Sequence, residues 1–292
     1  MNPIIQIQEV HKSFGSKHVL NGISGTIQQG KVVGLLGRNG EGKTTLFRAM
    51  LDIISIDSGR VSISGFSPNG SGKTREFVGY VPERPAFHHF MTAEDVLHLR
   101  SEFFPKWRWD KAFQIAKELE LDLKTHIKGA SKGTLAKIAW VCATAHDPEV
   151  LLLDEPTSGL DLLVRDSVLQ HLVSELSQEG RTIFVANHRM EELLGILDEV
   201  WLLQNGRILE VYSIDDLREH ACRINGRLRT NGSVPPSVVE EQRTGDLVTW
   251  LVLNRDTFEN IRQQQLLDSM ERQPLPIETT FKLLLARKGE NV

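Results

Sequence analysis

A glycine-rich loop that ends in a lysine and a threonine is the first feature of the sequence that could do chemistry. Residues 37–44 read GRNGEGKT and fit the pattern G-x-x-x-x-G-K-[ST]. Glycines allow successive backbone N–H groups to point at a phosphate chain, and a following helix N-terminus adds positive potential. In such a loop Lys43 contacts the β- and γ-phosphates, and the Thr44 hydroxyl binds Mg²⁺. The loop therefore predicts a site for a nucleoside triphosphate with magnesium.

Two adjacent acids at the end of an apolar run form the second such feature. Residues 150–153 are Val-Leu-Leu-Leu, and Asp154 and Glu155 follow directly. In a phosphate-loop protein, an aspartate at this strand end holds Mg²⁺ directly or through water. The adjacent glutamate is placed to take a proton from the attacking water. The pair predicts a metal ligand, Asp154, beside a general base, Glu155.

Buried parallel strands must position these residues. Continuous apolar runs at 32–36, 150–153 and 182–186 are typical of strands that are covered on both faces. A helix is expected to begin near Lys43, and another is expected over about 162–178. The alternation of strand, loop and helix predicts an α/β fold with a mainly parallel core sheet. Further strands are expected within residues 4–10, 18–27, 60–82 and 199–212, and a helical stretch, interrupted by Pro105, within 92–123.

A second glycine-rich run, at residues 67–74, also ends in Gly-Lys-Thr. It has Ser67 where the first glycine of the phosphate loop belongs, and no buried strand leads into it. We interpret this run as a surface turn.

The run LDEPTSGLD at residues 153–161 resembles the Walker B motif and D-loop of ATP-binding cassette (ABC) ATPases. The chain presents the other motifs of that family in the family's order, and the resemblance covers about residues 4–215. The matching positions are Phe14 for the aromatic that stacks on adenine, Glu83 in the Q-loop, Ser131 and Gly133 in the signature motif, and His188 for the switch histidine.

The resemblance implies the P-loop NTPase fold of an ABC cassette, with an antiparallel β subdomain and a helical subdomain at about 84–128. The cassette is expected to span residues 1–221. Beyond about residue 222 the sequence becomes polar and contains proline, and residues 222–292 are expected to form a small C-terminal α/β accessory domain. Within it, 247–253 is predicted as a strand and 257–270 and 278–287 as helices.

The resemblance also implies a head-to-tail dimer that encloses two ATP molecules. Glu155 is then the general base, and His188 and Lys43 contact the γ-phosphate. Ser131 and the Gly133 backbone contact the γ-phosphate bound by the other subunit. The residues expected at ATP are Phe14, Gly37, Arg38, Asn39, Gly40, Glu41, Gly42, Lys43, Thr44, Thr45, Glu83, Ser131, Gly133 and Asp161, and those expected at Mg²⁺ are Thr44, Asp154 and Glu83.

The sequence departs from the family pattern at the Q-loop and the signature motif. Glu83 replaces the usual glutamine, which either strengthens metal contact or slows hydrolysis. In the signature, usually LSGGQ, Ala130, Lys132 and Thr134 replace the leucine, the first glycine and the glutamine. Lys132 either adds positive charge near the phosphate of the other subunit or faces solvent.

Composition limits the classes of binding partner and the cellular location that we expect. The chain has 292 residues and a net charge of −4, so broad nucleic-acid binding is not expected. No apolar stretch reaches the ~18 residues of a membrane span, and the first residues lack a signal-peptide pattern. The expected location is therefore cytoplasmic, peripheral on the cytoplasmic face of the membrane through a permease.

Three functional hypotheses follow. The leading one is the ATP-hydrolysing subunit of an ABC transporter that drives a separately encoded permease, as a homodimer or with a paired cassette subunit. A soluble ABC ATPase that acts on ribosomes or DNA is the alternative, but the chain has one uninterrupted cassette and no coiled-coil insertion. A weakly hydrolysing, nucleotide-sensing regulatory subunit is the third, motivated by Glu83 and the altered signature. Aromatic and basic residues at 103–109 either pack the helical subdomain, dock a permease or stack on nucleic acid.

Overall fold

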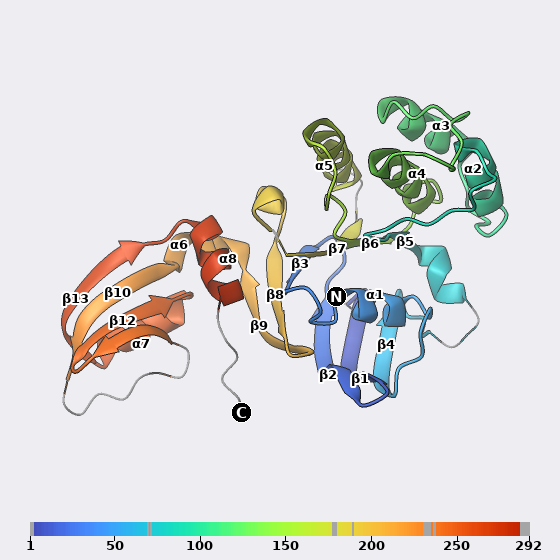
Figure 1. Ribbon diagram of the computed structural model, residues 1–292. Coiled ribbons are helices and arrows are strands. Elements are labelled where there is room, and N and C mark those ends of the chain that lie inside the picture. The colour runs from blue at the N-terminus through green and yellow to red at the C-terminus, as the bar shows by residue number, and fades with distance from the viewer. Residues whose placement is uncertain are drawn as a thin grey trace. The chain divides into compact units, whose positions relative to one another are not determined.

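The computed structural model describes residues 3–68, 70, 72–176, 180–188, 190–229, 235 and 238–286 (Figure 1). The chain divides into two compact units. The first consists of residues 1–189 and 201–210, and the second of residues 190–200 and 211–292. No helix within the described residues is both long enough and apolar enough to cross a bilayer.

A six-stranded sheet positions the chemistry of the first unit. Its order is β5-β6-β7-β3-β8-β9, and β5, β6, β7 and β3 run parallel. The predicted strands at 32–36, 150–153 and 182–186 are confirmed as β3, β6 and β7, and all their residues are buried. Because parallel strands share one carboxyl edge, the loops after these three strands meet there. The strands are β3 (Val32–Leu36), β5 (Val78–Val81), β6 (Val150–Asp154), β7 (Thr182–Asn187), β8 (Glu199–Gln204) and β9 (Arg207–Ser213).

An antiparallel sheet of order β2-β1-β4 lies in the same unit. Apolar side chains of this sheet share one core with helix α1 (Lys43–Met50) and with β3 and β7. In that core the Phe184 ring meets Phe47 and Trp201 edge-on, at centroid distances of 5.2 and 5.3 Å. Gly25 permits the close packing, because a Cβ there would lie 2.3 Å from the Trp201 ring. The strands are β1 (Ile5–Phe14), β2 (Lys17–Ile27) and β4 (Ser58–Ile63).

Three helices, α2, α3 and α4, lie between β5 and β6 along the chain, and α5 follows β6. The predicted helical stretch is interrupted as expected, because α2 ends at Ser101 and α3 begins at Trp109. Thr92 and Asp95 form a reciprocal capping box that fixes the start of α2. The helices are α2 (Ala93–Ser101), α3 (Trp109–Glu118), α4 (Lys132–Thr144) and α5 (Leu162–Leu176). The structure also contains two short 3₁₀ helices, η1 (Lys73–Phe77) and η2 (Met190–Leu193). In the second glycine-rich run, residues 69 and 71 lie outside the described residues.

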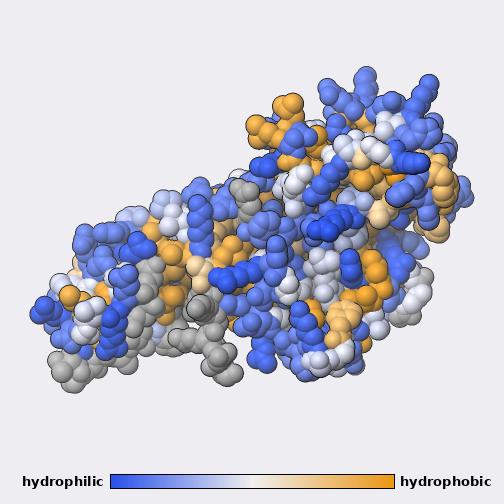
Figure 2. All heavy atoms as spheres, viewed as in Figure 1, coloured by the Kyte–Doolittle hydropathy of each residue, from blue (hydrophilic) through white to orange (hydrophobic). Residues whose placement is uncertain are grey.

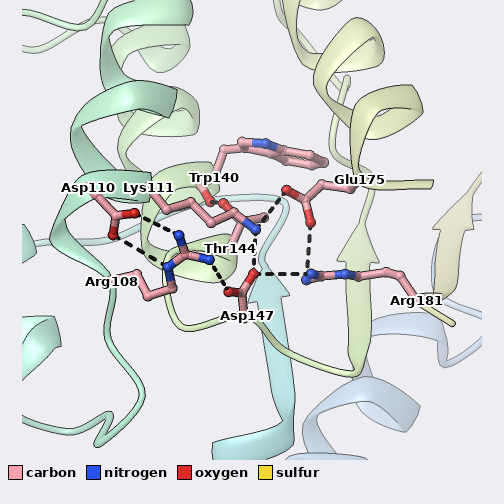
Figure 3. A network of polar contacts seen from close by, with 8 residues as sticks. All are labelled: Arg108, Asp110, Lys111, Trp140, Thr144, Asp147, Glu175 and Arg181. Carbon is pink, nitrogen blue, oxygen red and sulfur yellow. Dashed lines mark hydrogen bonds and ion pairs between the residues drawn. The ribbon is translucent and has the colours of Figure 1, made fainter. Parts of the chain in front are cut away.

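A network of charged side chains ties α3 to α5 and to the start of β7 (Figure 3). Asp147, in the turn after α4, accepts from Lys111 Nζ at 2.8 Å, Arg108 Nη1 at 3.0 Å and Arg181 Nη2 at 3.3 Å. Glu175 of α5 lies 3.2 Å from Lys111 and 3.1 Å from Arg181. Because Lys111, Glu175 and Arg181 are buried, each charge depends on its partners. The network thereby fixes the helices around the strand that leads to His188.

The Asp147→Asn variant should be less stable at neutral pH and nearly equal to the wild type in acid. Burial raises the pKa of Asp147, but hydrogen bonds from Lys111 and Arg108 outweigh it and hold the pKa at about 2. An unfolded aspartate titrates near pH ~3.9, so the contribution of Asp147 is complete above that value and is lost as pH falls toward 2.

After screening by solvent, we expect a loss of about 1 kcal/mol at neutral pH. Urea unfolding of wild type and variant near neutral pH and near pH ~2 measures it. Asp110→Asn, which removes only a pairing with Arg108, is the matched control and should have the smaller effect. A difference that stays constant with pH would contradict this assignment.

The second unit is built around a four-stranded antiparallel sheet of order β11-β12-β10-β13. Trp250 is fully buried in its core, and Ile261 and Phe258 of α7 pack into the same cluster. Helices α6 and α8 complete the unit. Its elements are α6 (Ile214–His220), β10 (Cys222–Leu228), β11 (Val239–Thr244), β12 (Leu247–Val252), α7 (Arg255–Gln263), β13 (Leu267–Pro274) and α8 (Ile277–Ala286).

The helix predicted over 257–270 is wrong in its second half. Helix α7 ends at Gln263, and Gln265 adopts a left-handed φ of 48° that turns the chain. Residues 267–274 then form strand β13, which pairs antiparallel with β10. Its side chains are almost all exposed, as at a sheet edge, so no apolar alternation announces it. Of the other predicted elements there, 247–253 is confirmed as β12 and 278–286 as part of α8, whereas residue 287 lies outside the described residues.

Candidate nucleotide-binding site

The glycine-rich loop lies between β3 and α1, as the motif requires. Gly42 caps the helix with φ 109°, and Gly40 has φ 88°, conformations that glycine adopts without steric cost. A Cβ on Gly42 would also lie 3.0 Å from the Val19 carbonyl oxygen. Helix α1 therefore begins directly at Lys43, and its first N–H groups face the loop.

Lys43 and Glu155 are joined at the carboxyl edge of the sheet. Lys43 Nζ donates to the Gly37 carbonyl at 2.8 Å and the Arg38 carbonyl at 3.2 Å, and lies 3.2 Å from Glu155 Oε1. Both side chains are buried, with 6% and 7% exposed. Each group offsets part of the cost of burying the other. The loop thus holds its cation where a phosphate chain would lie.

His188 completes this cluster from the end of β7. Its Nδ1 lies 2.6 Å from Glu155 Oε2. We assign the proton to Nδ1, because an ionised carboxylate only accepts hydrogen bonds. Glu155 has a φ of 50°, a conformation that is costly for a residue with a Cβ and that gathers at functional sites. Three residues predicted as catalytic, Lys43, Glu155 and His188, are therefore brought together.

Asp154 is buried beside the cluster and has room for a cation. Burial raises its pKa, and a hydrogen bond with the Thr44 hydroxyl opposes that rise. Tyr80 Oη lies 3.5 Å from Oδ2, whereas Oδ1 is buried and has no hydrogen-bond partner among the described residues. An unpartnered buried carboxylate oxygen next to a hydroxyl suits a hard cation such as Mg²⁺, which prefers oxygen ligands.

Within the described residues no group of three His, Cys, Asp or Glu side chains is arranged to hold a metal. Mg²⁺ characteristically takes one or two protein oxygens and completes its shell with phosphate and water, so Thr44 and Asp154 are a sufficient set. Glu83, the third predicted metal ligand, is 38% exposed and lies 3.6 Å from Arg84. Its charge is nonetheless close enough to raise the pKa of Asp154.

The remaining predicted residues lie on other elements. Phe14 stands exposed at the end of β1, with Lys12 Nζ 5.3 Å from its ring centroid. Ser131 caps α4 by accepting from Thr134 N at 3.0 Å, and Asp161 Oδ1 accepts from Val164 N at the start of α5. Among the described residues, Ser131 is not hydrogen-bonded to the phosphate loop or the Glu155 cluster.

Residues of the loop itself are placed as its conformation dictates. Arg38, Asn39 and Gly40 are exposed, and Glu41, Thr44 and Thr45 are half-buried. The Glu41 carboxylate accepts from the backbone N–H of Asn205, so it is occupied in holding a neighbouring turn. Any contribution of residue 41 to phosphate binding therefore belongs to its backbone.

Sequence reasoning missed one participant, Tyr80, and one contact of a residue that it had named, Lys132. Tyr80 pairs in register with Leu152 of β6, which places its ring beside the strand that ends in Asp154. Burial raises the pKa of Tyr80, so the phenol stays protonated and donates. The one sequence feature that could have pointed to Tyr80 is its position as a lone tyrosine in the apolar strand β5. Lys132, predicted either to lie near the phosphate of the other subunit or to face solvent, is exposed and donates to the Ser158 carbonyl, a contact that no sequence pattern predicts.

Comparison with known proteins decides the family. The family model described as ABC transporter matches residues 20–158, which hold the phosphate loop and the Asp154–Glu155 pair. An uncharacterised ABC transporter ATP-binding protein of Methanocaldococcus jannaschii, MJ1023, is 33% identical over 241 residues, covering 78% of this chain and 86% of that protein. The chain belongs to the ABC transporter family.

Solved ABC structures agree. A structure described as the ATP binding subunit of an ABC transporter has TM-score 0.67 and 25% identity, covering 74% of this chain and 92% of that one. The ABC protein cbiO1 of Clostridium perfringens, described as part of the complex cbiONQ, has TM-score 0.61 and 27% identity, covering 74% and 90%. The predicted ABC cassette fold and the predicted role as ATPase subunit of an ABC transporter are confirmed.

Proposed function

We propose that this ABC subunit pairs with a second cassette around two ATP molecules and, by hydrolysing them, drives a separately encoded membrane permease. The single observation that carries the proposal is the position of Glu155, held 3.2 Å from Lys43 and 2.6 Å from His188. A base, a phosphate-binding cation and a γ-phosphate sensor thus meet at one point of the sheet edge. The second cassette is another copy of this chain or a paired subunit.

The residues of this chain divide the work of hydrolysis. Lys43 and the loop N–H groups hold the β- and γ-phosphates. The Thr44 hydroxyl and the Asp154 carboxylate hold Mg²⁺, which neutralises phosphate charge when bound. Glu155 takes a proton from water as the water oxygen attacks the γ-phosphorus and ADP departs. His188, oriented through Nδ1, directs its other ring nitrogen to the γ-phosphate.

The other predicted residues complete this proposal. Phe14 stacks on the adenine, and Glu83 approaches the metal from the Q-loop. Ser131 and Gly133 contact the γ-phosphate of the opposite cassette, and Asp161 faces that cassette beside them. We also propose that residues 222–292 form an accessory domain attached to a cassette of residues 1–221.

A cavity next to Glu83 supports docking of a membrane partner. It has a volume of about 440 Å³ and is lined mainly by apolar side chains of the segment after the Q-loop, of α2 and of α4, including Pro82, Met91 and Leu99. Phe90 and Phe103 are strongly exposed nearby in sequence, at 78% and 65%. Figure 2 shows hydrophobic residues at the surface around these helices. Exposed apolar surface of this kind marks an interaction site, and we propose the permease as its occupant.

Affinity purification from detergent-solubilised membranes tests the proposal. The tagged full-length chain should bring down one membrane protein. Met91→Glu, which puts a charge into the cavity, should lose that protein and still bind ATP. Ile53→Glu, at an exposed apolar residue that does not line the cavity, is the matched control and should retain it. Recovery of ribosomes or DNA instead would contradict the transport role, and absence of ATP turnover with and without the permease would favour a nucleotide sensor.

A further inference from the structure

Lys132 takes the place of a signature-motif glycine, and the structure gives it a partner. It is the first residue of α4, and its Nζ donates to the carbonyl of Ser158. Ser158 lies in the loop that joins Glu155 to α5. We propose that Lys132 is a positioning residue for ATP hydrolysis, which holds this loop, and through it Glu155, against the first turn of α4. The inference rests on the proposed role of Glu155 as general base.

The side chain of Lys132 fits along Gly159. A Cβ built on Gly159 would lie 2.5 Å from Lys132 Nζ, 3.5 Å from Cε and 3.6 Å from Cδ. Gly159 also has a φ of +65°, where glycine is favoured. The lysine methylenes therefore follow a backbone that has no side chain, and the ammonium reaches the preceding carbonyl.

The backbone of Ser158 links the Lys132 contact to Glu155. Its N–H donates to the Glu155 carbonyl at 3.0 Å, and the Glu155 N–H donates to the Ala186 carbonyl at 2.8 Å. Lys132 holds the carbonyl side of the same residue. A positive φ at a residue with a Cβ persists only where the surroundings over-determine it. Lys132 supplies one of the constraints that keep Glu155 in this conformation.

Helix stability gives no reason for a lysine at this position. A cation in the first turn opposes the helix dipole, and Ser131 already caps α4. Gly133, the next residue, packs close to α5, because a Cβ there would lie 3.2 Å from Val164 Cγ2. The first turn of α4 is thus packed against α5, beside the loop that Lys132 contacts. The backbone of Lys132 is therefore held in place while its side chain bonds to the loop.

Steady-state ATP hydrolysis by the purified full-length chain tests the inference. Lys132→Met should lower kcat about three- to tenfold, the worth of one hydrogen bond, with KM for ATP unchanged within about twofold. Lys132→Arg, which keeps a donor of similar reach, should recover most of kcat. In a Glu155→Gln background, Lys132→Met should cause no further loss in single-turnover hydrolysis, because it acts through Glu155. Lys128→Met, at an exposed lysine in the loop before α4, is the charge-matched control and should leave kcat unchanged.

The outcomes separate the inference from the function on which it rests. If Glu155→Gln lowers kcat as expected and Lys132→Met leaves kcat unaltered, the inference is overturned and the proposed function stands. A raised KM, or an equal loss in the Glu155→Gln background, would show that Lys132 acts on the nucleotide itself and would also overturn it. A wild type without turnover, or Glu155→Gln at full turnover, would contradict the proposed function and the inference together. Lys132→Ala, which also removes the donor, gives the same comparison should the methionine variant fail to fold.

Discussion

Replacing Glu155 by glutamine should reduce ATP turnover about 10²–10⁴-fold, the usual contribution of a general base. The amide matches the carboxylate in size, and its oxygen can still accept from Lys43, whereas its NH2 group faces His188 Nδ1 and requires the imidazole to accept there. The amide cannot take a proton from water at neutral pH. The loss should therefore appear in kcat, measured as phosphate release.

ATP binding should survive this substitution. Glu155 Oε1 lies 3.2 Å from Lys43 Nζ, so the carboxylate competes with phosphate oxygens for the same ammonium. Removal of its charge leaves Lys43 fully available, and ATP affinity measured by equilibrium binding should hold or rise. Glu102→Gln, at an exposed residue after α2, is the control for removal of a carboxylate. Turnover within about threefold of wild type would refute the assignment of the base.

Replacing Lys43 by methionine should lower kcat/KM for ATP about 10²–10³-fold, the loss seen when a preorganised charge-stabilising donor is removed. Two carbonyl oxygens of its own loop, at 2.8 and 3.2 Å, hold the ammonium in place. Among the described residues, the variant also leaves the buried Glu155 carboxylate with His188 as its remaining side-chain partner. Weaker ATP binding and a lower Tm should therefore occur together.

Lys73→Met is the matched control for Lys43→Met. Lys73 also follows a glycine and precedes a threonine, but its Nζ lies 4.7 Å from the Phe66 ring centroid and it opens a 3₁₀ helix. Its substitution should leave ATP affinity within about twofold of wild type. Equal losses in the two variants would mean that the second glycine-rich run, and not only residues 37–44, binds nucleotide. Lys43→Arg keeps the charge but replaces a compact ammonium by a wide fork, and should recover little activity.

The sequence predicts the core of this fold because its central strands are buried on both faces. Such strands must be apolar throughout, as in 32–36 and 150–153, and their ends are therefore visible as the first polar residues. Those polar residues form the predicted site. Lys43, Asp154, Glu155 and His188 were found because each directly follows a buried strand or its loop, and the parallel order brings them to one edge.

Elements without that constraint were harder to predict. Strand β13 is an edge strand with exposed side chains, and its pairing with β10 depends on a partner about 45 residues away in the chain. The contact between Lys132 and Ser158 could not be predicted for another reason. A lysine reaches several ångströms from its backbone, so its spacing in the sequence does not reveal which carbonyl it will meet. Contacts made by long side chains and by sheet edges are set by tertiary packing, which periodicity does not encode.

Helix α4 touches the cavity beside Glu83 and also begins at the signature residues. Ala139 and Cys142 line that cavity, and Ser131 caps the other end. At 1.5 Å per residue, about 12 Å of continuous helix separates Ser131 from Ala139. An intact helix of this length moves as a rod. A chain bound in the cavity and a phosphate held by the opposite cassette would therefore both contact α4. A displacement of the helix at one contact would then displace it at the other.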